Sequence, residues 1–242
     1  MTPVVFVHGF LGGSRQWQGQ VEALAQQFDV ITVDLPGFGE NAQLEALDSI
    51  ADFATWVLDD LTARGIGRFH LIGHSMGGMV AQDMVAQAPD RIEQLVLYGT
   101  GATGVLPGRF ETIGTSRRRA RADGSQATAR RIAATWFLDR ENAAAYEDCA
   151  AIAEQGSLQA ILSGLDAMQN WGGTERLSEM DVKTLVIWGD HDRTYPWSQT
   201  EQLWRSIPGA SLAVIPDSAH ATHLEKPGLF NRILGDFLQV SG

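Results

Sequence analysis

A single serine separates an apolar run from a helical pattern in the stretch Phe69-His70-Leu71-Ile72-Gly73-His74-Ser75-Met76-Gly77-Gly78-Met79-Val80. Its centre, Gly73 to Gly77, fits G-x-S-x-G, the sharp turn that lifts a serine off the end of a strand. The chain reverses so tightly there that a Cβ at either flanking glycine would meet the neighbouring strand or helix. The serine hydroxyl then lies at a helix N-terminus, where free N–H groups and the helix dipole favour negative charge. The stretch therefore predicts that Ser75 is a nucleophile.

Short apolar runs alternate with helical patterns on both sides of this stretch. Strands are expected at residues 4–8, 30–33, 69–73, 94–98, 184–188 and 211–215. Helices are expected at residues 17–27, 49–63, 78–88, 199–206 and 229–238. Such alternation predicts right-handed βαβ crossovers and an α/β fold, in which helices cover both faces of a mainly parallel, six-stranded sheet.

The alternation stops in the middle of the chain. No strand is expected between residues 104 and 176, and helical patterns cover 126–137, 141–154 and 157–168. We therefore expect a core made of residues 1–103 and 177–242, with residues 104–176 inserted as a helical cap.

Composition and charge exclude several functional classes. The formal net charge is −11, which argues against a nucleic-acid partner, because phosphate binding needs a basic surface. The only cysteine, Cys149, leaves no intrachain disulfide and fits a reducing compartment. Residues 1–3 lead directly into an apolar strand, so no signal peptide is expected, and no apolar run reaches the ~18 residues of a membrane span. A cytoplasmic, soluble protein with no membrane partner is the expectation.

Chemically reactive residues follow three of the predicted strands. In an open parallel sheet, ligands bind outside the carboxyl ends of the strands. Ser75, Asp192 and His220 all fall there, in the order Ser…Asp…His. His220 is the expected base for Ser75, and Asp192 is expected to fix its tautomer and stabilise the imidazolium. Asp190 competes with Asp192, but the later carboxylate lies further out in its loop and is preferred.

Two backbone N–H groups are expected to bind the oxyanion of the tetrahedral intermediate. That of Met76 opens the helix after Ser75, and that of Phe10 lies in the glycine-rich loop after the first strand. His223, three residues after His220, is interpreted as a capping or pocket-lining residue. The six histidines show no H-x-x-x-H pair and there is no cysteine pair, so no metal site is expected.

Together these segments resemble the α/β-hydrolases, in the compact, capped form of serine hydrolases. The matching motifs are His8-Gly9-Phe10, Asp34-Leu35-Pro36-Gly37-Phe38-Gly39, Gly73-His74-Ser75-Met76-Gly77-Gly78, Gly189-Asp190-His191-Asp192 and Ala219-His220. The resemblance implies an ester, thioester or lactone hydrolase that works through an acyl-enzyme and needs no cofactor. The antiparallel hairpin that usually precedes the first motif-bearing strand has no room here, which implies six strands instead of eight.

Other reactions use the same three residues. The segments 8–11 and 220–227, with Trp17, are similar to the menaquinone-pathway synthase that makes 2-succinyl-6-hydroxy-2,4-cyclohexadiene-1-carboxylate by elimination. That family typically has an arginine after the glycines of the elbow, where this chain has Met79. A carbon–carbon bond hydrolase and a non-catalytic small-molecule receptor on the same fold are further alternatives.

The cap supplies the candidates for substrate binding. Six arginines lie between positions 117 and 131, and they could form a solvated helix face or an anion site. An anion site would hold a substrate carboxylate, or an acidic acyl carrier protein if the chain resembles the pimeloyl-carrier-protein methyl esterases. The tentative substrate-binding residues are Trp17, Arg118, Arg121, Trp136, Trp171 and His223. Phe137 and Met168 are further candidates for the acyl pocket, although aromatic residues at helical spacing also occur as simple packing.

Overall fold

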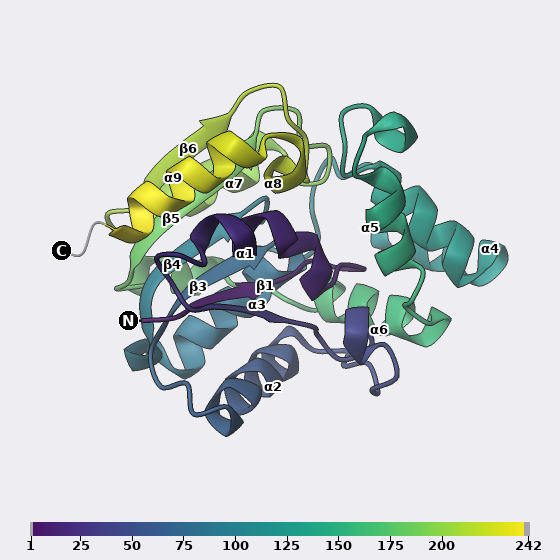
Figure 1. The fold of residues 1–242 in the computed structure, drawn as a ribbon. Helices are drawn as coiled ribbons and strands as arrows, with labels where there is room; N and C mark the ends of the chain where they lie inside the picture. The colour runs from purple at the N-terminus through teal and green to yellow at the C-terminus, as the bar shows by residue number, and fades with distance from the viewer. Residues whose placement is uncertain (1, 240–242) are drawn as a thin grey trace.

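The computed structural model describes residues 2–239 and contains one six-stranded parallel sheet in the order β2-β1-β3-β4-β5-β6 (Figure 1). Its strands are β1 Val4–Val7, β2 Val30–Val33, β3 Phe69–His74, β4 Ile92–Tyr98, β5 Lys183–Gly189 and β6 Ser211–Ile215. The predicted six-stranded α/β fold is confirmed. All six carboxyl ends lie at one edge of the sheet, so the loops that follow the strands lie close together.

Helices cover both faces of this sheet (Figure 1). The α-helices of residues 2–239 are α1 Gln18–Leu24, α2 Ile50–Ala63, α3 Met76–Gln87, α4 Ile113–Ala134, α5 Tyr146–Ala153, α6 Leu158–Gln169, α7 Trp197–Ser206, α8 Thr222–Glu225 and α9 Pro227–Gln239, of which α4, α5 and α6 belong to the insertion. Helices α1 and α9 pack on one face, and α2 and α3 pack together on the other. Side chains of β1 alternate between the two: Val4 and Phe6 join the α1–α9 core, and Val5 and Val7 join the opposite core.

The inserted helices α4, α5 and α6 lie together at one end of the sheet (Figure 1). The chain leaves the core and rejoins it side by side, because Thr103 and Gly172 form an antiparallel bridge. A buried carboxylate ties the same region to α3, since Asp83 accepts hydrogen bonds from Trp171 Nε1 and Arg176 Nη1, both at 2.6 Å. The insertion is thus fastened to the core at its base.

Two helices of the insertion differ from the expected ranges. Helix α4 begins at Ile113, well before residue 126, and its chain breaks at Gly124, where φ is +84°. The predicted helix over 141–154 is shorter, because a 3₁₀ turn, Arg140–Asn142, precedes α5. Within residues 2–239, no helix combines the length and apolar character needed to cross a membrane.

Candidate active site

Ser75 lies at the sharp turn between β3 and α3. Its backbone has φ +56° and ψ −121°, a conformation that non-glycine residues rarely adopt and that costs energy. A Cβ on Gly77 would come within 2.3 Å of the Val7 carbonyl oxygen, and one on Gly73 within 2.4 Å of the Gly77 carbonyl oxygen. The Thr100 hydroxyl donates to the Ser75 carbonyl at 2.7 Å, which helps to hold the strained turn.

The His220 side chain meets a carboxylate on the loop after β5. Its Nδ1–H donates to Asp192 Oδ2 at 2.8 Å, and both side chains are almost fully buried. The other carboxylate oxygen, Oδ1, accepts from the backbone N–H groups of Thr194 and Tyr195 at 2.7 and 3.1 Å. Asp192 therefore fixes the ring of His220 while its own turn fixes the carboxylate. Asp190 instead accepts from the Ser218 N–H at 3.3 Å.

The backbone of His220 is held as firmly as its ring. Its carbonyl oxygen accepts from the Tyr98 hydroxyl at 2.7 Å and from His74 Nε2–H at 3.1 Å. His74 also stacks on Tyr98, with ring centroids 4.4 Å apart. Burial and the neighbouring histidines hold the pKa of His74 well below its usual value, so its ring is neutral. Two residues of β3 and β4 thus position the loop that carries His220.

His223 lies behind this site and does not line it. Its Nδ1 contacts the Tyr98 hydroxyl at 3.1 Å, and its ring lies 4.4 Å from that of Trp17. Burial, with a smaller effect of His220, lowers the pKa of His223 to about 3. His223 and Trp17, both tentative substrate-binding residues, are packed in the core between α1 and α9. Neither side chain is among the residues that line the pocket beside Ser75, so the structure does not bring these two candidates to it.

The loop after β1 lies directly against Ser75. A Cβ on Gly9 would come within 2.8 Å of the Ser75 Cβ, so only glycine allows this approach. His8 holds the loop: its Nε2 accepts from the Leu35 N–H at 3.0 Å and its Nδ1–H donates to the Gly9 carbonyl at 2.8 Å. Phe10 lines the same pocket as Ser75. Met76 is the first residue of α3, so its N–H has no partner within the helix.

A small cavity adjoins Ser75 and His220, between the sheet edge and the insertion. Its apolar lining is Phe10, Leu106, Phe110, Ile132, Trp136 and Met168; its polar lining includes Ser75, Arg109, Thr194, Tyr195 and His220. The cavity volume is about 20 Å³, room for one water molecule. A substrate must therefore displace side chains of the insertion or of the loop after β4.

The cavity contains two of the predicted acyl-pocket residues, Trp136 and Met168. Trp171 is not among its lining residues, because its indole is directed to Asp83 at the base of the insertion. Phe137 is fully buried and also lies outside the lining. The structure thus places Trp171 at the base of the insertion and outside this cavity; an indole that anchors a helix has the same sequence spacing as one that lines a pocket.

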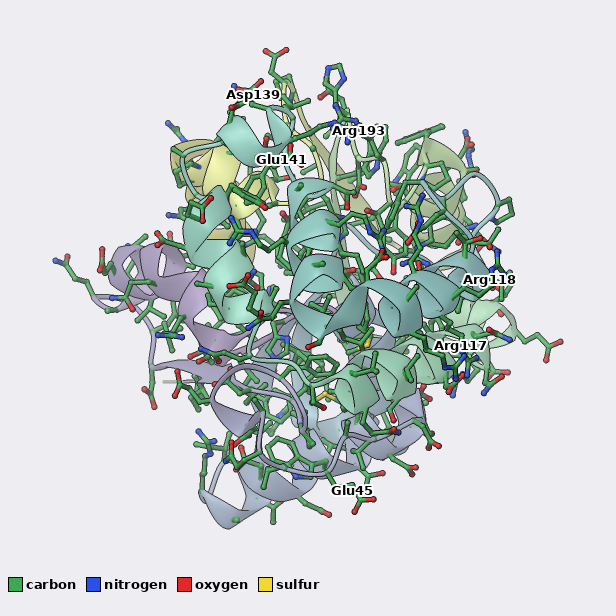
Figure 2. The ribbon with its side chains drawn as sticks, turned by 90° about the vertical axis from the view of Figure 1, so that its right-hand side faces the viewer. Glu45, Arg117, Arg118, Asp139, Glu141 and Arg193 are labelled. Atoms are coloured by element: carbon green, nitrogen blue, oxygen red, sulfur yellow. The ribbon has the colours of Figure 1, made fainter. Side chains whose placement is uncertain are left out.

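The arginine cluster of α4 is mostly paired with carboxylates. Arg117 pairs with Asp166, Arg119 and Arg131 pair with Glu111, and Arg130 pairs with Glu147 and Glu154. Arg118 and Arg121, two tentative substrate-binding residues, are exposed and are not among the residues that line the cavity. Figure 2, which faces the insertion, shows Arg118 at the periphery of the molecule.

Two residues of the cavity were not expected from the sequence. The Tyr195 ring stacks on His220 at a centroid distance of 5.7 Å. Burial raises the pKa of Tyr195 to about 12, although the neighbouring Ser75 side chain acts in the opposite direction. Arg109, in the loop after β4, is the arginine of the cavity. Neither residue belongs to a recognisable sequence pattern. Among residues 2–239, no cluster of three or more potential ligands could hold a metal ion.

Comparison with known proteins identifies the family. A family model described as "alpha/beta hydrolase fold" matches residues 2–227. A Klebsiella pneumoniae protein provisionally named carbamate hydrolase RutD is 30% identical, over 98% of this chain and 91% of that protein. The dihydrolipoyllysine-residue acetyltransferase component of the acetoin cleaving system of Cupriavidus necator is 28% identical over 96% of this chain, which spans only 62% of its length.

Solved structures agree with this result. The enol-lactonase from Burkholderia xenovorans superposes with a TM-score of 0.89 at 26% identity, covering 98% of this chain and 92% of the enol-lactonase chain. The family match, the relatives and the fold are consistent with one another across the core and the insertion. The chain is therefore a hydrolase of the α/β-hydrolase family.

Proposed function

We propose that this hydrolase cleaves carboxylic esters or lactones through an acyl-enzyme on Ser75. The Ser75 Oγ attacks the substrate carbonyl carbon and gives its proton to His220 Nε2. His220 then passes that proton to the departing alkoxide, and the acyl group remains on Ser75. A water molecule, deprotonated by His220, attacks the acyl carbon, and release of the acid returns the proton to Ser75.

One observation carries the proposal: the buried hydrogen bond of 2.8 Å between His220 Nδ1–H and Asp192 Oδ2, in a pocket that also contains Ser75. Because Nδ1 holds its proton toward a carboxylate, the lone pair of the neutral ring is on Nε2. That is the tautomer a general base needs, and the carboxylate stabilises the imidazolium once the proton arrives.

The expected oxyanion donors support the same reaction. Met76 N–H opens α3, where the helix dipole adds to its effect on negative charge. Phe10 follows Gly9, whose missing side chain allows the loop after β1 to approach Ser75. We assign the oxyanion of the tetrahedral intermediate to these two N–H groups.

The names of the relatives favour an acyl carbon with a heteroatom leaving group. The enol-lactonase is named for a cyclic ester, and the Klebsiella protein is named for carbamates. Both kinds of substrate have a carbonyl carbon bonded to an oxygen or nitrogen leaving group. Carboxylic esters and lactones share this electrophile with them, and we extend that reaction class to this chain.

Steady-state turnover tests the proposal. Wild type, Ser75→Ala and His220→Ala are compared on 4-nitrophenyl acetate, 4-nitrophenyl butyrate and a lactone, with His191→Ala as the control, because His191 is an exposed histidine of the Asp192 loop. We expect Ser75→Ala and His220→Ala each to lower kcat by ~10³-fold or more, and His191→Ala to change it by less than about threefold.

A fluorophosphonate probe gives an independent measurement. Mass spectrometry of the labelled, digested wild type should place the adduct on the peptide that contains Ser75. Turnover that survives in Ser75→Ala, or an adduct elsewhere, would remove Ser75 from the mechanism. A folded wild type that turns over no ester or lactone would instead favour the elimination or carbon–carbon reactions.

A further inference from the structure

Arg109 is a cationic side chain at the cavity that forms no ion pair with any of residues 2–239. It lies in the loop between β4 and α4 and lines the cavity together with Ser75 and His220. Its Nη1 atom is buried and has no hydrogen-bond partner. Within the described residues, its side chain makes no ion pair, and its guanidinium contacts the Phe110 ring at 4.9 Å.

Glu111, the carboxylate that acts electrostatically on Arg109, is already occupied. Glu111 Oε1 accepts from the Ser116 hydroxyl at 2.6 Å and from Arg131 Nη1 at 2.8 Å. Its Oε2 accepts from Arg119 Nη1 at 3.1 Å. The one negative charge of Glu111 thus faces two bound guanidinium groups, and Arg109 adds a third positive charge beside them.

Several observations place Arg109 near the reacting groups. Tyr195 lines the same cavity as Arg109 and Ser75, and its ring stacks on His220 at a centroid distance of 5.7 Å. Burial, the largest effect, lowers the pKa of Arg109 against the opposing charge of Glu111, and the nearby charge of Arg131 lowers it further. An anion would relieve both effects, because it replaces lost hydration and offsets the charge of Arg131.

We propose that Arg109 binds a free carboxylate on the substrate, so that the natural ester or lactone is a monoanion such as a dicarboxylic acid hemiester. This inference rests on the proposed function, whose substrate class it narrows. A guanidinium donates two parallel hydrogen bonds to a carboxylate, and the single charge of Arg109 matches the single charge of that group. The remaining cavity lining is largely apolar and suits the methylene chain between the carboxylate and the ester.

Paired substrates test the inference. Mono-4-nitrophenyl glutarate carries a free carboxylate, and 4-nitrophenyl pentanoate is a neutral ester of similar length. Wild type should show a higher kcat/KM for the glutarate. Arg109→Gln should lower kcat/KM for the glutarate by about 30-fold, which is the loss expected for hydrogen bonds to a charged group. The same variant should change kcat/KM for the pentanoate by less than threefold. Arg109→Lys should restore part of the loss.

Arg118→Gln is the matched control, because Arg118 is exposed, lies outside the cavity lining and donates a hydrogen bond to the Thr115 hydroxyl at 3.1 Å. It should leave both substrates unchanged. Equal losses on both substrates in Arg109→Gln, or no loss on either, would overturn the proposal and leave the ester hydrolase intact. A wild type that prefers the neutral ester would overturn it even if the Arg109 variants failed to fold.

Binding without turnover separates the two proposals. In Ser75→Ala, calorimetry should detect monomethyl glutarate but not dimethyl glutarate, and the added change Arg109→Gln should abolish the signal. If wild type hydrolyses no ester yet this binding depends on Arg109, the carboxylate site stands and the hydrolysis does not. If monomethyl and dimethyl glutarate bind equally, or neither binds, the carboxylate site is refuted.

Discussion

Replacing Tyr98 by phenylalanine removes one oxygen atom that joins three groups behind the active site. The Tyr98 side chain is fully buried. Its hydroxyl donates to the His220 carbonyl at 2.7 Å and accepts from the His223 backbone N–H at 3.2 Å. Because that hydroxyl proton is used on His220, the contact of 3.1 Å with His223 Nδ1 is a second hydrogen bond that Tyr98 accepts.

The expected cost follows from the groups left without partners. The His220 carbonyl keeps the hydrogen bond from His74 Nε2–H, but the two N–H groups of His223 lose their acceptor inside the core. An unsatisfied buried donor costs about 1–3 kcal/mol, so Tyr98→Phe should lower the free energy of unfolding by about 3 kcal/mol. The effect on kcat/KM should stay below about tenfold, because Asp192 still orients the His220 ring.

Urea unfolding followed by circular dichroism measures the loss. Tyr146→Phe is the matched control, because Tyr146 is also buried but makes one long hydrogen bond, 3.4 Å to the Arg130 carbonyl, and should lose less than about 1 kcal/mol. Tyr98→Phe that unfolds at the same urea concentration as the wild type would show that the network is not stabilising. A Tyr98→Phe variant that is stable but loses kcat 1000-fold would assign the hydroxyl a direct part in catalysis.

Three further predictions follow from the geometry. Gly77→Ala places a Cβ within 2.3 Å of a carbonyl oxygen of β1 and should lower the free energy of unfolding, measured in urea, by about 3 kcal/mol or more. Gly235→Ala, whose Cβ meets open space in α9, should leave it unchanged or raise it by about 0.5–1 kcal/mol. Equal effects of the two changes would contradict the packing argument. The pKa of His223 falls from 6.5 to about 3 on folding, so the stability that depends on a neutral His223 is intact above pH 6.5 and is lost as the pH falls toward 3. Between pH 7.5 and 5 the free energy of unfolding should drop by about 2 kcal/mol more in the wild type than in His223→Gln. Parallel pH curves of the two proteins would exclude this effect of His223. Asp192→Asn should lower kcat by ~10⁴-fold, and Asp190→Asn should lower it by less than about threefold. The reverse ranking would mean that Asp190 orients the His220 ring.

The sheet was predictable because a parallel strand is buried on both faces. Such strands appear as short, unbroken apolar runs, as Val4–Val7 does in β1. The expected ranges 30–33 and 211–215 also match β2 and β6, the two edge strands, although these are only partly buried. Every other strand ends within two residues of its expected bounds. The loops after the strands then follow from the topology, which is why the contact between Asp192 and His220 could be anticipated without coordinates.

The insertion was less predictable because local sequence does not reveal what a helix packs against. Helix α4 begins at Ile113, although Gly114 and a run of polar residues weaken its helical pattern. Its buried face becomes visible only when α5 and α6 pack on it. Trp136 and Trp171 show the same difficulty: one lines the cavity and the other bonds to Asp83, yet both occur as isolated indoles between helices.

The arginines differ in which of them form ion pairs, and sequence density alone does not reveal this. The cluster on α4 attracted attention because it is dense, but density on a helix face also brings carboxylates within reach, and Glu111, Glu147, Glu154 and Asp166 neutralise most of it. Arg109 stands alone in a loop and has no pattern to mark it. Its significance comes from Glu111 being occupied by Arg119 and Arg131, contacts that only the fold creates. A cation of this kind is informative because an unpaired buried charge is costly, and a substrate anion is the partner that would offset that cost at the cavity.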